Sequence, residues 1–242
     1  MTTYKIADKM IAIEPMYASV SELWKGYEHP GEPELVIKTV KDDITYEQER
    51  SDSNNIAEGK PPHEYEAPYL EELSVYRKLC DWLPFYNTVL FHCSCVVVGG
   101  QAYAFTAKSG TGKSTHTRLW REYLGERAVM LNDDKPLIRC KDAAATIFGT
   151  PYMGKHSLGR NMSAPLRAIC ILERGEQNEI EKLTREQAYP MLVQQTYRPF
   201  DVHALSMTMQ TIDSFSRGVS LYRLKANMDI SAAKLAFETM SR

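Results

Sequence analysis

The sequence lacks a long apolar run. No stretch approaches the roughly 18 consecutive apolar residues of a membrane-spanning helix. The first 15 residues carry Lys5, Asp8 and Lys9 among their apolar residues, so they lack the continuous apolar core of a signal peptide. We therefore expect a cytoplasmic protein with no membrane partner.

An excess of positive charge is also missing. Lysine and arginine number 29 against 31 aspartates and glutamates, which gives a formal net charge of −2. A nucleic-acid partner attracts a protein mainly through clustered positive charge. We therefore expect no nucleic-acid partner, and the sequence leaves a homo-oligomer open.

Cysteine is scarce and unpatterned. The chain has five cysteines, an odd number, and no Cys-x-x-Cys pair of the kind that holds zinc. A chain of 242 residues also has no need of disulfides to complete its core. We expect buried thiols in a reducing compartment.

The composition that is present fits a globular protein of one large domain or two small ones. Hydrophobic residues make up 43% of the chain and aromatic residues 10%. Residues 49–67 are polar and contain a Pro-Pro pair, which predicts a linker. We expect a β-rich N-terminal subdomain with this linker over residues 1–67, and a second domain over residues 68–242.

In the first subdomain we expect extended segments around a short helix. The segments are KMIAIEP, MYASVSELW, PELVIKTV and ITYEQ.

The second domain mixes helices and strands. Helical spacing of leucines predicts a helix from Pro68 to Leu83, and Gly99-Gly100 predicts a tight hairpin turn between residues 88–98 and 101–107. Further strands are predicted at AVMLN, ATIFG, LRAICILE and GVSLYRLKA, and further helices at KSTHTRLWREYL, REQAYPMLVQQ (interrupted by Pro190), VHALSMTMQTIDSFSR and DISAAKLAFETM. The order predicts an α/β or α+β fold, a mixed sheet flanked by helices.

The stretch TAKSGTGKST, residues 106–115, follows an apolar strand and opens an amphipathic helix, which is the context of a P-loop. Backbone N–H groups from Ser109 to Lys113 are expected to bind phosphate, with Lys113 along the β and γ phosphates and Ser114 as a Mg²⁺ ligand. The predicted nucleotide-binding residues of the loop are Ser109, Gly110, Thr111, Gly112, Lys113, Ser114 and Thr115. Ala107 stands where such a loop usually begins with glycine.

Two carboxylates end the next predicted strand. Asp133 and Asp134 come 20 and 21 residues after Lys113. One carboxylate fits a Mg²⁺ shell, and a neighbouring one with a raised pKa could accept a proton from an attacking hydroxyl. The alternative is a solvated turn at the end of a strand.

The predicted hairpin makes His92 a candidate site residue. If Gly99 and Gly100 form a two-residue turn, counting outward from the Val98–Gln101 pair places His92 opposite Ala107, at the mouth of the loop. The alternative is a satisfied core histidine. Cys93 and Cys95 would then face the other side of the sheet.

These residues together resemble the catalytic core of the HPr kinase/phosphorylase family, which belongs with the phosphoenolpyruvate carboxykinases. His92 precedes Lys113 at the family's spacing, Ser109–Ser114 matches Ser-Gly-x-Gly-Lys-Ser, and a paired aspartate follows. The resemblance covers residues 88–140. It implies Asp133 as the base that deprotonates a serine hydroxyl, Asp134 as a metal-shell residue, and His92 as a partner on the phosphate side.

The chain departs from that family at several points. Cys93 follows the histidine where the family usually has glycine, and the family's later Arg-Gly-x-Gly signature is not recognisable. The Gly-punctuated residues 149–168 carry Lys155, His156 and Arg160 instead. Lys155 and Arg160 could fold over the nucleotide and neutralise transition-state charge, and the alternative is a solvated basic loop.

The sequence therefore predicts an ATP- and Mg²⁺-dependent phosphotransferase with Asp133, His92 and Lys113 as catalytic residues. The expected acceptor is a hydroxyl, either a serine of a protein or peptide or a small molecule. One alternative is a nucleotide-binding regulatory module without catalysis. Another is a carboxykinase, for which the chain looks short.

Overall fold

The structure is a computed structural model that describes residues 1–57, 59–142 and 144–242. The chain forms two units, Met1–Trp82 and Leu83–Arg242. This division follows helix α3 (Ala67–Trp82), whereas the expected boundary followed residue 67. Helix α3 packs on α1 (Ala18–Leu23), α2 (Lys41–Ala57) and β3 (Leu35–Lys38), so it belongs to the first unit.

The first unit contains a three-stranded sheet. Strand β1 (Thr2–Ile6) pairs antiparallel with β2 (Lys9–Glu14), which pairs parallel with β3. Tyr4, Trp24 and Tyr27 form an aromatic cluster in its core. The expected strands KMIAIEP and PELVIKTV and the expected short helix are therefore present, within one or two residues.

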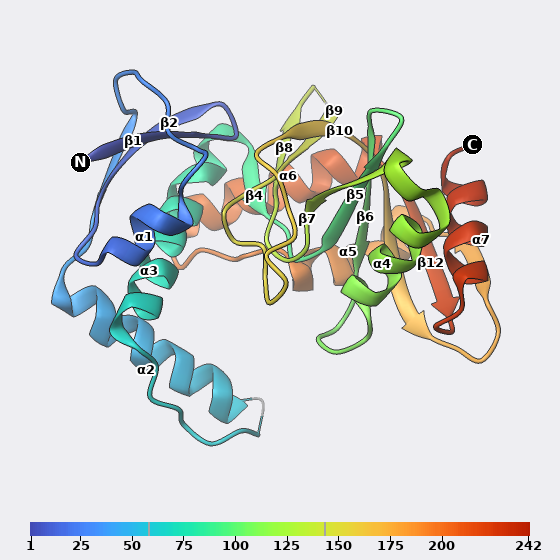
Figure 1. Cartoon of the computed structure of the whole chain (residues 1–242), viewed down its shortest axis with the longest axis horizontal. Helices are drawn as coiled ribbons and strands as arrows, with labels where there is room; N and C mark the ends of the chain where they lie inside the picture. The colour runs from blue at the N-terminus through green and yellow to red at the C-terminus, as the bar shows by residue number, and fades with distance from the viewer. Residues whose placement is uncertain (58, 143) are drawn as a thin grey trace. The chain divides into compact units, whose positions relative to one another are not determined.

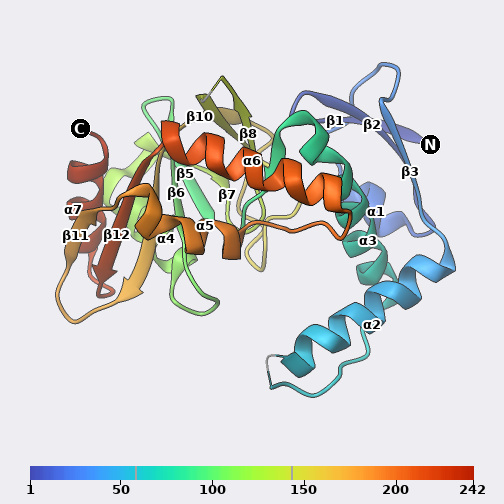
Figure 2. The same cartoon turned by 180° about the vertical axis from the view of Figure 1, so that it is seen from behind.

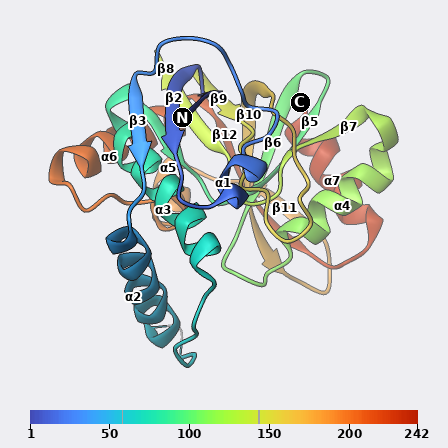
Figure 3. The ribbon, with the colours of Figure 1, turned by 60° about the vertical axis from the view of Figure 1, so that its left-hand side comes forward.

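Helix α2 corrects the prediction for residues 41–57. ITYEQ was expected to be extended and residues 49–57 to be a loop, but both lie in this helix, which runs beside α3 (Figure 3). Asp43 accepts a hydrogen bond from the Val40 N–H at 2.9 Å in the first turn, and it also binds Lys78 at 2.7 Å. Arg77 of α3 pairs with Glu47. Charged side chains make these contacts of α2 with α3. The helix therefore has no apolar stripe at helical spacing from which it could be predicted.

The second unit is a mixed α/β fold. Its strands are β4 (Thr88–Leu90), β5 (Ser94–Val98), β6 (Gln101–Thr106), β7 (Ala128–Asn132), β8 (Leu137–Lys141), β9 (Ala144–Phe148), β10 (Ser163–Arg174), β11 (Glu179–Lys182) and β12 (Ser220–Ala226). Its α-helices are α4 (Lys113–Leu124), α5 (Arg185–Gln195), α6 (Val202–Gly218) and α7 (Ile230–Met240), with 3₁₀ turns at Leu83–Tyr86 and Gly125–Arg127. The predicted mixed sheet flanked by helices is confirmed.

The nine strands of this unit's described residues form one sheet. Its order runs β4-β8-β9-β10-β6-β5-β7. Strand β12 also pairs with β10, along Ala168–Arg174, and β11 pairs with β12. Strands β6, β10 and β12 run parallel, while β5 is antiparallel to both β6 and β7. The carboxyl ends of β6, β7, β10 and β12 therefore share one edge of the sheet.

Helices cover both faces of this sheet. Helices α4 and α7 pack together on one face (Figure 1), and α5 and α6 lie on the other (Figure 2). Strand β10 contributes side chains to both faces of the sheet. Ala168, Cys170 and Leu172 pack toward α4 and α7. Ile169 and Ile171 pack toward α5 and α6. This alternation is the two-residue period of a strand buried on both faces.

Several local predictions can be checked directly. The five cysteines are buried free thiols. Helix α5 continues through Pro190, where an interruption was expected, and Thr184 forms a capping box with Gln187 at its start. No helix in the described part of the chain is both long and apolar enough to cross a bilayer.

Candidate active site

The predicted loop and both aspartates lie at the shared carboxyl edge of the sheet. The loop follows β6, and Asp133 and Asp134 follow β7. His92 precedes β5, whose opposite direction brings its amino end to the same edge. Topology thus gathers residues that are up to 42 positions apart in sequence.

The loop itself depends on two glycines. Gly110 and Gly112 have φ angles of 75° and 121°, which L-amino acids with a Cβ rarely adopt. Gly112 is the N-cap of α4 and has no side chain, so the cap residue itself makes no side-chain bond to the first N–H groups of that helix. The Thr111 N–H is hydrogen-bonded to the Lys108 carbonyl at 3.3 Å, so this N–H closes the turn inside the loop. The amino end of a helix favours anions, because its N–H groups and the helix dipole point toward them, and the loop places its glycines at this end of α4.

Lys113 folds back along the loop. Its Nζ donates to the Ala107 carbonyl at 3.4 Å. Burial lowers the pKa of Lys113, and Asp134, Cys93 and Asp133 oppose this shift electrostatically. The lysine therefore lies within electrostatic range of both aspartates, with its ammonium held at the start of the loop.

Asp133 is buried, with 5% of its surface exposed. Ser94 of β5 donates its hydroxyl to Asp133 Oδ1 at 2.6 Å. The same hydroxyl lies 2.8 Å from Thr117 Oγ1 of α4. Ser94 and Thr117 thus connect the carboxylate to the helix that begins at the loop. Ser94 was not predicted as a site residue, although it lies two residues after His92.

Asp134 pairs with His92. The distance from His92 Nε2 to Asp134 Oδ1 is 3.0 Å, and Lys135 Nζ lies 3.7 Å from Oδ2. Burial by itself raises the pKa of Asp134. The hydrogen bond with His92 and the positive charges of Lys135 and Lys113 lower it by more, so the net shift of the pKa is downward. One member of the pair was expected to have a raised pKa, and Asp134 is not that member. The two carboxylates have separate partners, so Asp134 has no need to share a proton.

The hairpin register is partly confirmed. Val98 pairs with Gln101 across the Gly99-Gly100 turn, but the ladder ends at Ser94 opposite Phe105. His92 lies beyond it and is not in a cross-strand pair with Ala107. The Thr106 hydroxyl donates to the His92 carbonyl at 2.9 Å, and the His92 N–H donates to the Gln195 carbonyl at 2.8 Å. These bonds hold His92 where its ring meets Asp134.

The segment 149–162 contacts the end of β7. A Cβ on Gly154, whose φ is 73°, would lie 3.1 Å from the Asp134 Cβ. The Arg160 N–H donates to the Leu131 carbonyl at 3.0 Å. Lys155, His156 and Arg160 have exposed side chains on this segment. The predicted basic residues therefore lie on a loop whose base touches Asp134.

Arg174 was not predicted. It ends β10, the strand beside β6, and its Nη2 donates to the Gly110 carbonyl at 2.6 Å. Only the tertiary pairing of β10 with β6 brings it to the loop. Its position as the last residue of a buried strand was the one sequence signal.

A cavity of about 470 Å³ lies against the loop on the β10 and β12 side. Its apolar walls include Leu119 of α4 and Leu172 of β10, and Met228 follows β12 at its rim. His116 of α4 also lines it. Burial lowers the pKa of His116 to about 4, and the Trp120 indole N–H donates to its Nε2 at 3.1 Å. Glu173, Arg174 and Asn227 also line the cavity, so this side of the loop combines apolar walls with a few polar and charged groups.

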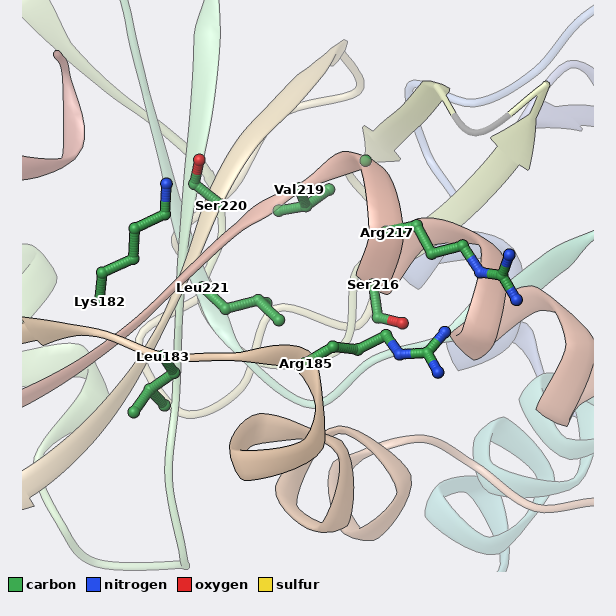
Figure 4. A pocket seen from close by; sticks show the side chains of 9 residues that line it. Lys182, Leu183, Arg185, Ser216, Arg217, Val219, Ser220 and Leu221 are labelled. Atoms are coloured by element: carbon green, nitrogen blue, oxygen red, sulfur yellow. The ribbon is translucent and has the colours of Figure 1, made fainter.

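A second cavity, of about 630 Å³, lies between the start of β12 and the ends of α5 and α6 (Figure 4). Arg185 and Arg217 each approach Asp213 at 2.7 Å, so one carboxylate already neutralises part of their charge. The cavity adjoins the amino end of β12, whereas the loop lies at the carboxyl edge. It is therefore separate from the candidate site.

A Mg²⁺ ion could be held by the oxygen atoms of this edge. No cluster of three or more histidines, cysteines, aspartates and glutamates suited to a metal occurs within residues 1–57, 59–142 and 144–242. Mg²⁺ bound to a nucleotide usually takes only one or two protein oxygen ligands, besides phosphates and water. The Ser114 hydroxyl at the uncapped amino end of α4 and an ionised Asp134 fit that donor set.

Comparison with known proteins yields structural likenesses but no match in sequence. No protein-family model and no curated protein matches the chain. Among solved structures, the Hpr(Ser) kinase/phosphatase from Coxiella burnetii is similar over 63% of this chain and 93% of its own, with 10% sequence identity and a TM-score of 0.34. This is a distant structural relationship to an HPr kinase/phosphatase.

Proposed function

We propose that the protein is an ATP-dependent phosphotransferase that moves the γ-phosphoryl group of Mg-ATP to a hydroxyl group. The observation that carries the proposal is the convergence at one sheet edge of an uncapped helix start, Lys113, and two aspartates with separate partners. Phosphoryl transfer depends on this combination, because positioning and charge stabilisation supply most of the rate enhancement.

The loop from Ser109 to Thr115 binds the phosphate chain. Backbone N–H groups at the start of α4 receive the phosphate oxygens, and the helix dipole favours their negative charge. Lys113 leaves the Ala107 carbonyl to pair with the β and γ phosphates. Lys155 and Arg160 close over the transferring group from the neighbouring loop.

Asp133 accepts the proton. The acceptor hydroxyl gives its proton to Asp133 as its oxygen forms a bond to the γ-phosphorus, the bond from that phosphorus to the β–γ bridging oxygen breaks, and ADP leaves. Ser94 binds Oδ1 of Asp133, which leaves Oδ2 for the acceptor. Ser94 is thus a positioning residue.

Asp134 and His92 act on the phosphate side. The lowered pKa of Asp134 keeps it ionised near neutral pH, as a metal-shell residue requires. His92 orients Asp134 through Nε2 and contributes a polar edge toward the γ-phosphate. Bound Mg²⁺ would neutralise charge on the phosphates and would be held by Ser114 and Asp134.

A serine hydroxyl of a protein or peptide is the acceptor we favour, and a small hydroxyl compound is the other. An exposed basic loop beside the aspartates suits an acceptor segment that carries acidic residues.

One observation favours a nucleotide-binding module without catalysis. Asp133 is almost fully buried and one of its oxygens is already hydrogen-bonded, so an acceptor must approach through a small opening. Nucleotide turnover separates the two functions.

The test is incubation of the full chain with labelled ATP, Mg²⁺ and a lysate of its own cells. A labelled species that forms with the intact protein, and not with Lys113→Ala or Asp133→Asn, supports transfer and identifies the acceptor. If the protein binds ATP but neither transfers label nor releases ADP with any lysate fraction, the kinase proposal is wrong. The protein is then a nucleotide-binding module without catalysis.

A further inference from the structure

The cavity beside the loop has the size and lining of a small-molecule site. Its volume of about 470 Å³ lies within the ~300–1,000 Å³ usual for ligand pockets, which combine apolar walls with a few polar groups. Leu119 and Leu172 supply apolar walls, and the polar groups come from Thr115, Glu173, Arg174 and Asn227. Gly110 and Gly112 line it as well, so the cavity and the anion site share one boundary.

We infer that this cavity binds the nucleoside part of the nucleoside triphosphate, with its base between the Leu119–Leu172 wall and Met228. The inference rests on the proposed function, and it assigns residues that the loop motif does not contain. A phosphate chain bound at the amino end of α4 has its first phosphate next to this cavity, because the loop glycines line both.

Sheet order fixes which way the ligand lies. Strand β6 lies between β10 and β5, so the loop separates the cavity at β10 and β12 from the aspartates that follow β7. A nucleoside in the cavity therefore directs the far end of its phosphate chain toward Asp133 and Asp134. The reverse orientation would put the base beside two carboxylates, whereas the charged groups of this cavity stand next to its apolar walls.

Met228 provides an independent observation. It is 74% exposed at the rim of the cavity, so its side chain has room to move onto a ring bound there. The backbone on both sides is fixed: the Asn227 N–H donates to Asn178 Oδ1 at 2.9 Å, and the Asp229 N–H donates to Asn227 Oδ1 at 3.0 Å. The rim is thus preformed, and only the flexible thioether needs to move to cover an aromatic ring.

The experiment compares Mg-ATP with Mg-tripolyphosphate, which has the same number of phosphates and no nucleoside. We expect calorimetry on the full chain to give at least about tenfold tighter binding of ATP, because a buried base adds apolar contact. Met228→Ala should weaken ATP binding about two- to tenfold and leave tripolyphosphate unchanged. Val202→Ala, which truncates a similarly exposed apolar residue at the start of α6, should change neither.

A second measurement avoids any question of folding. In a spectrum of ¹³C-methyl-labelled methionines, the Met228 signal, assigned by its loss in Met228→Ala, should shift with ADP and stay in place with tripolyphosphate. Equal affinity for the two ligands, or an unmoved Met228 signal on saturation with ADP, would overturn the nucleoside site while leaving phosphate binding intact. Binding of neither ligand would overturn the proposed function itself.

Discussion

The two sides of the loop Ser109–Thr115 differ in which residues the neighbouring strand ends carry. On the β5 and β7 side, Asp133 and Asp134 each have a fixed hydrogen-bond partner, Ser94 and His92. On the β10 and β12 side, Leu119 and Leu172 line a cavity with an exposed methionine at its rim. The loop thus separates two aspartates with fixed partners from a cavity that has apolar walls as well as polar groups.

This difference suggests a division of labour between the two sides. Charged groups held by specific partners are suited to chemistry, because their positions are set before a substrate binds. An apolar cavity with a movable rim is suited to affinity. Substitutions on the two sides should therefore affect different quantities, turnover on one and binding on the other.

The largest effect is expected from Asp133→Asn on the polar side. Loss of the general base should lower the turnover number for phosphoryl transfer by about 10²- to 10⁴-fold. Single-turnover measurement with labelled ATP checks it. A variant that retains more than half of the wild-type rate would show that Asp133 does not accept the proton.

His116→Gln tests how well the α4 face excludes water. The folded-state pKa of His116 is about 4, below its ordinary 6.5, so the unfolded chain binds the proton first as pH falls. Stability should drop between pH 6.5 and 4, by up to about 3 kcal/mol or roughly 100-fold in the folding equilibrium. Glutamine can still accept from Trp120 but does not titrate, so this part of the loss should disappear.

Urea unfolding at pH 7, 5.5 and 4.5 makes the comparison. Parallel pH curves for the wild type and His116→Gln would mean that His116 is not held neutral by burial.

Ser94→Ala should have a smaller effect, confined to turnover. A hydrogen bond to a charged group contributes ~1.5–3 kcal/mol, so we expect about a tenfold or greater fall in turnover number with ATP affinity unchanged. Thr88→Val is the matched control, because this buried strand hydroxyl bonds only the Tyr86 carbonyl in the described contacts. Equal losses in both variants would indicate a purely structural role for Ser94.

The smallest effect is expected from Arg174→Ala. Its bond to the Gly110 carbonyl is exposed, so its loss should cost about 0.5–1.5 kcal/mol, a two- to tenfold weaker binding of ATP. Arg167→Ala is the control on the same strand, since Arg167 bonds the Arg242 carbonyl instead. Changed turnover with unchanged affinity would contradict the proposed division between the two sides.

Local signals predicted much of this edge. The Gly99-Gly100 turn, the strand before the loop and helix α4 follow from turn chemistry and helical spacing, and all three are present. Tertiary contacts account for what was missed. Arg174 reaches the loop only because β10 pairs with β6, and Ser94 matters only because β7 brings Asp133 beside it.

Two extrapolations failed for physical reasons. Counting along the hairpin placed His92 opposite Ala107, but the ladder stops at Ser94 and His92 turns to Asp134. The residues of α2 were predicted to be extended and loop. The helix was missed because Asp43 and Glu47 hold it to α3 through ion pairs, so it needs no apolar stripe. Its first-turn aspartates were the available signal.

ATP binding by Lys113→Ala and Asp133→Asn, measured side by side with Mg²⁺ present, tests the central claim most directly. We predict that Lys113→Ala weakens binding strongly, because the lysine pairs with the phosphates, and that Asp133→Asn binds like the wild type while transferring no label. Equal loss of binding in both variants would contradict this account, since it would make Asp133 a ligand of the nucleotide complex and not the base.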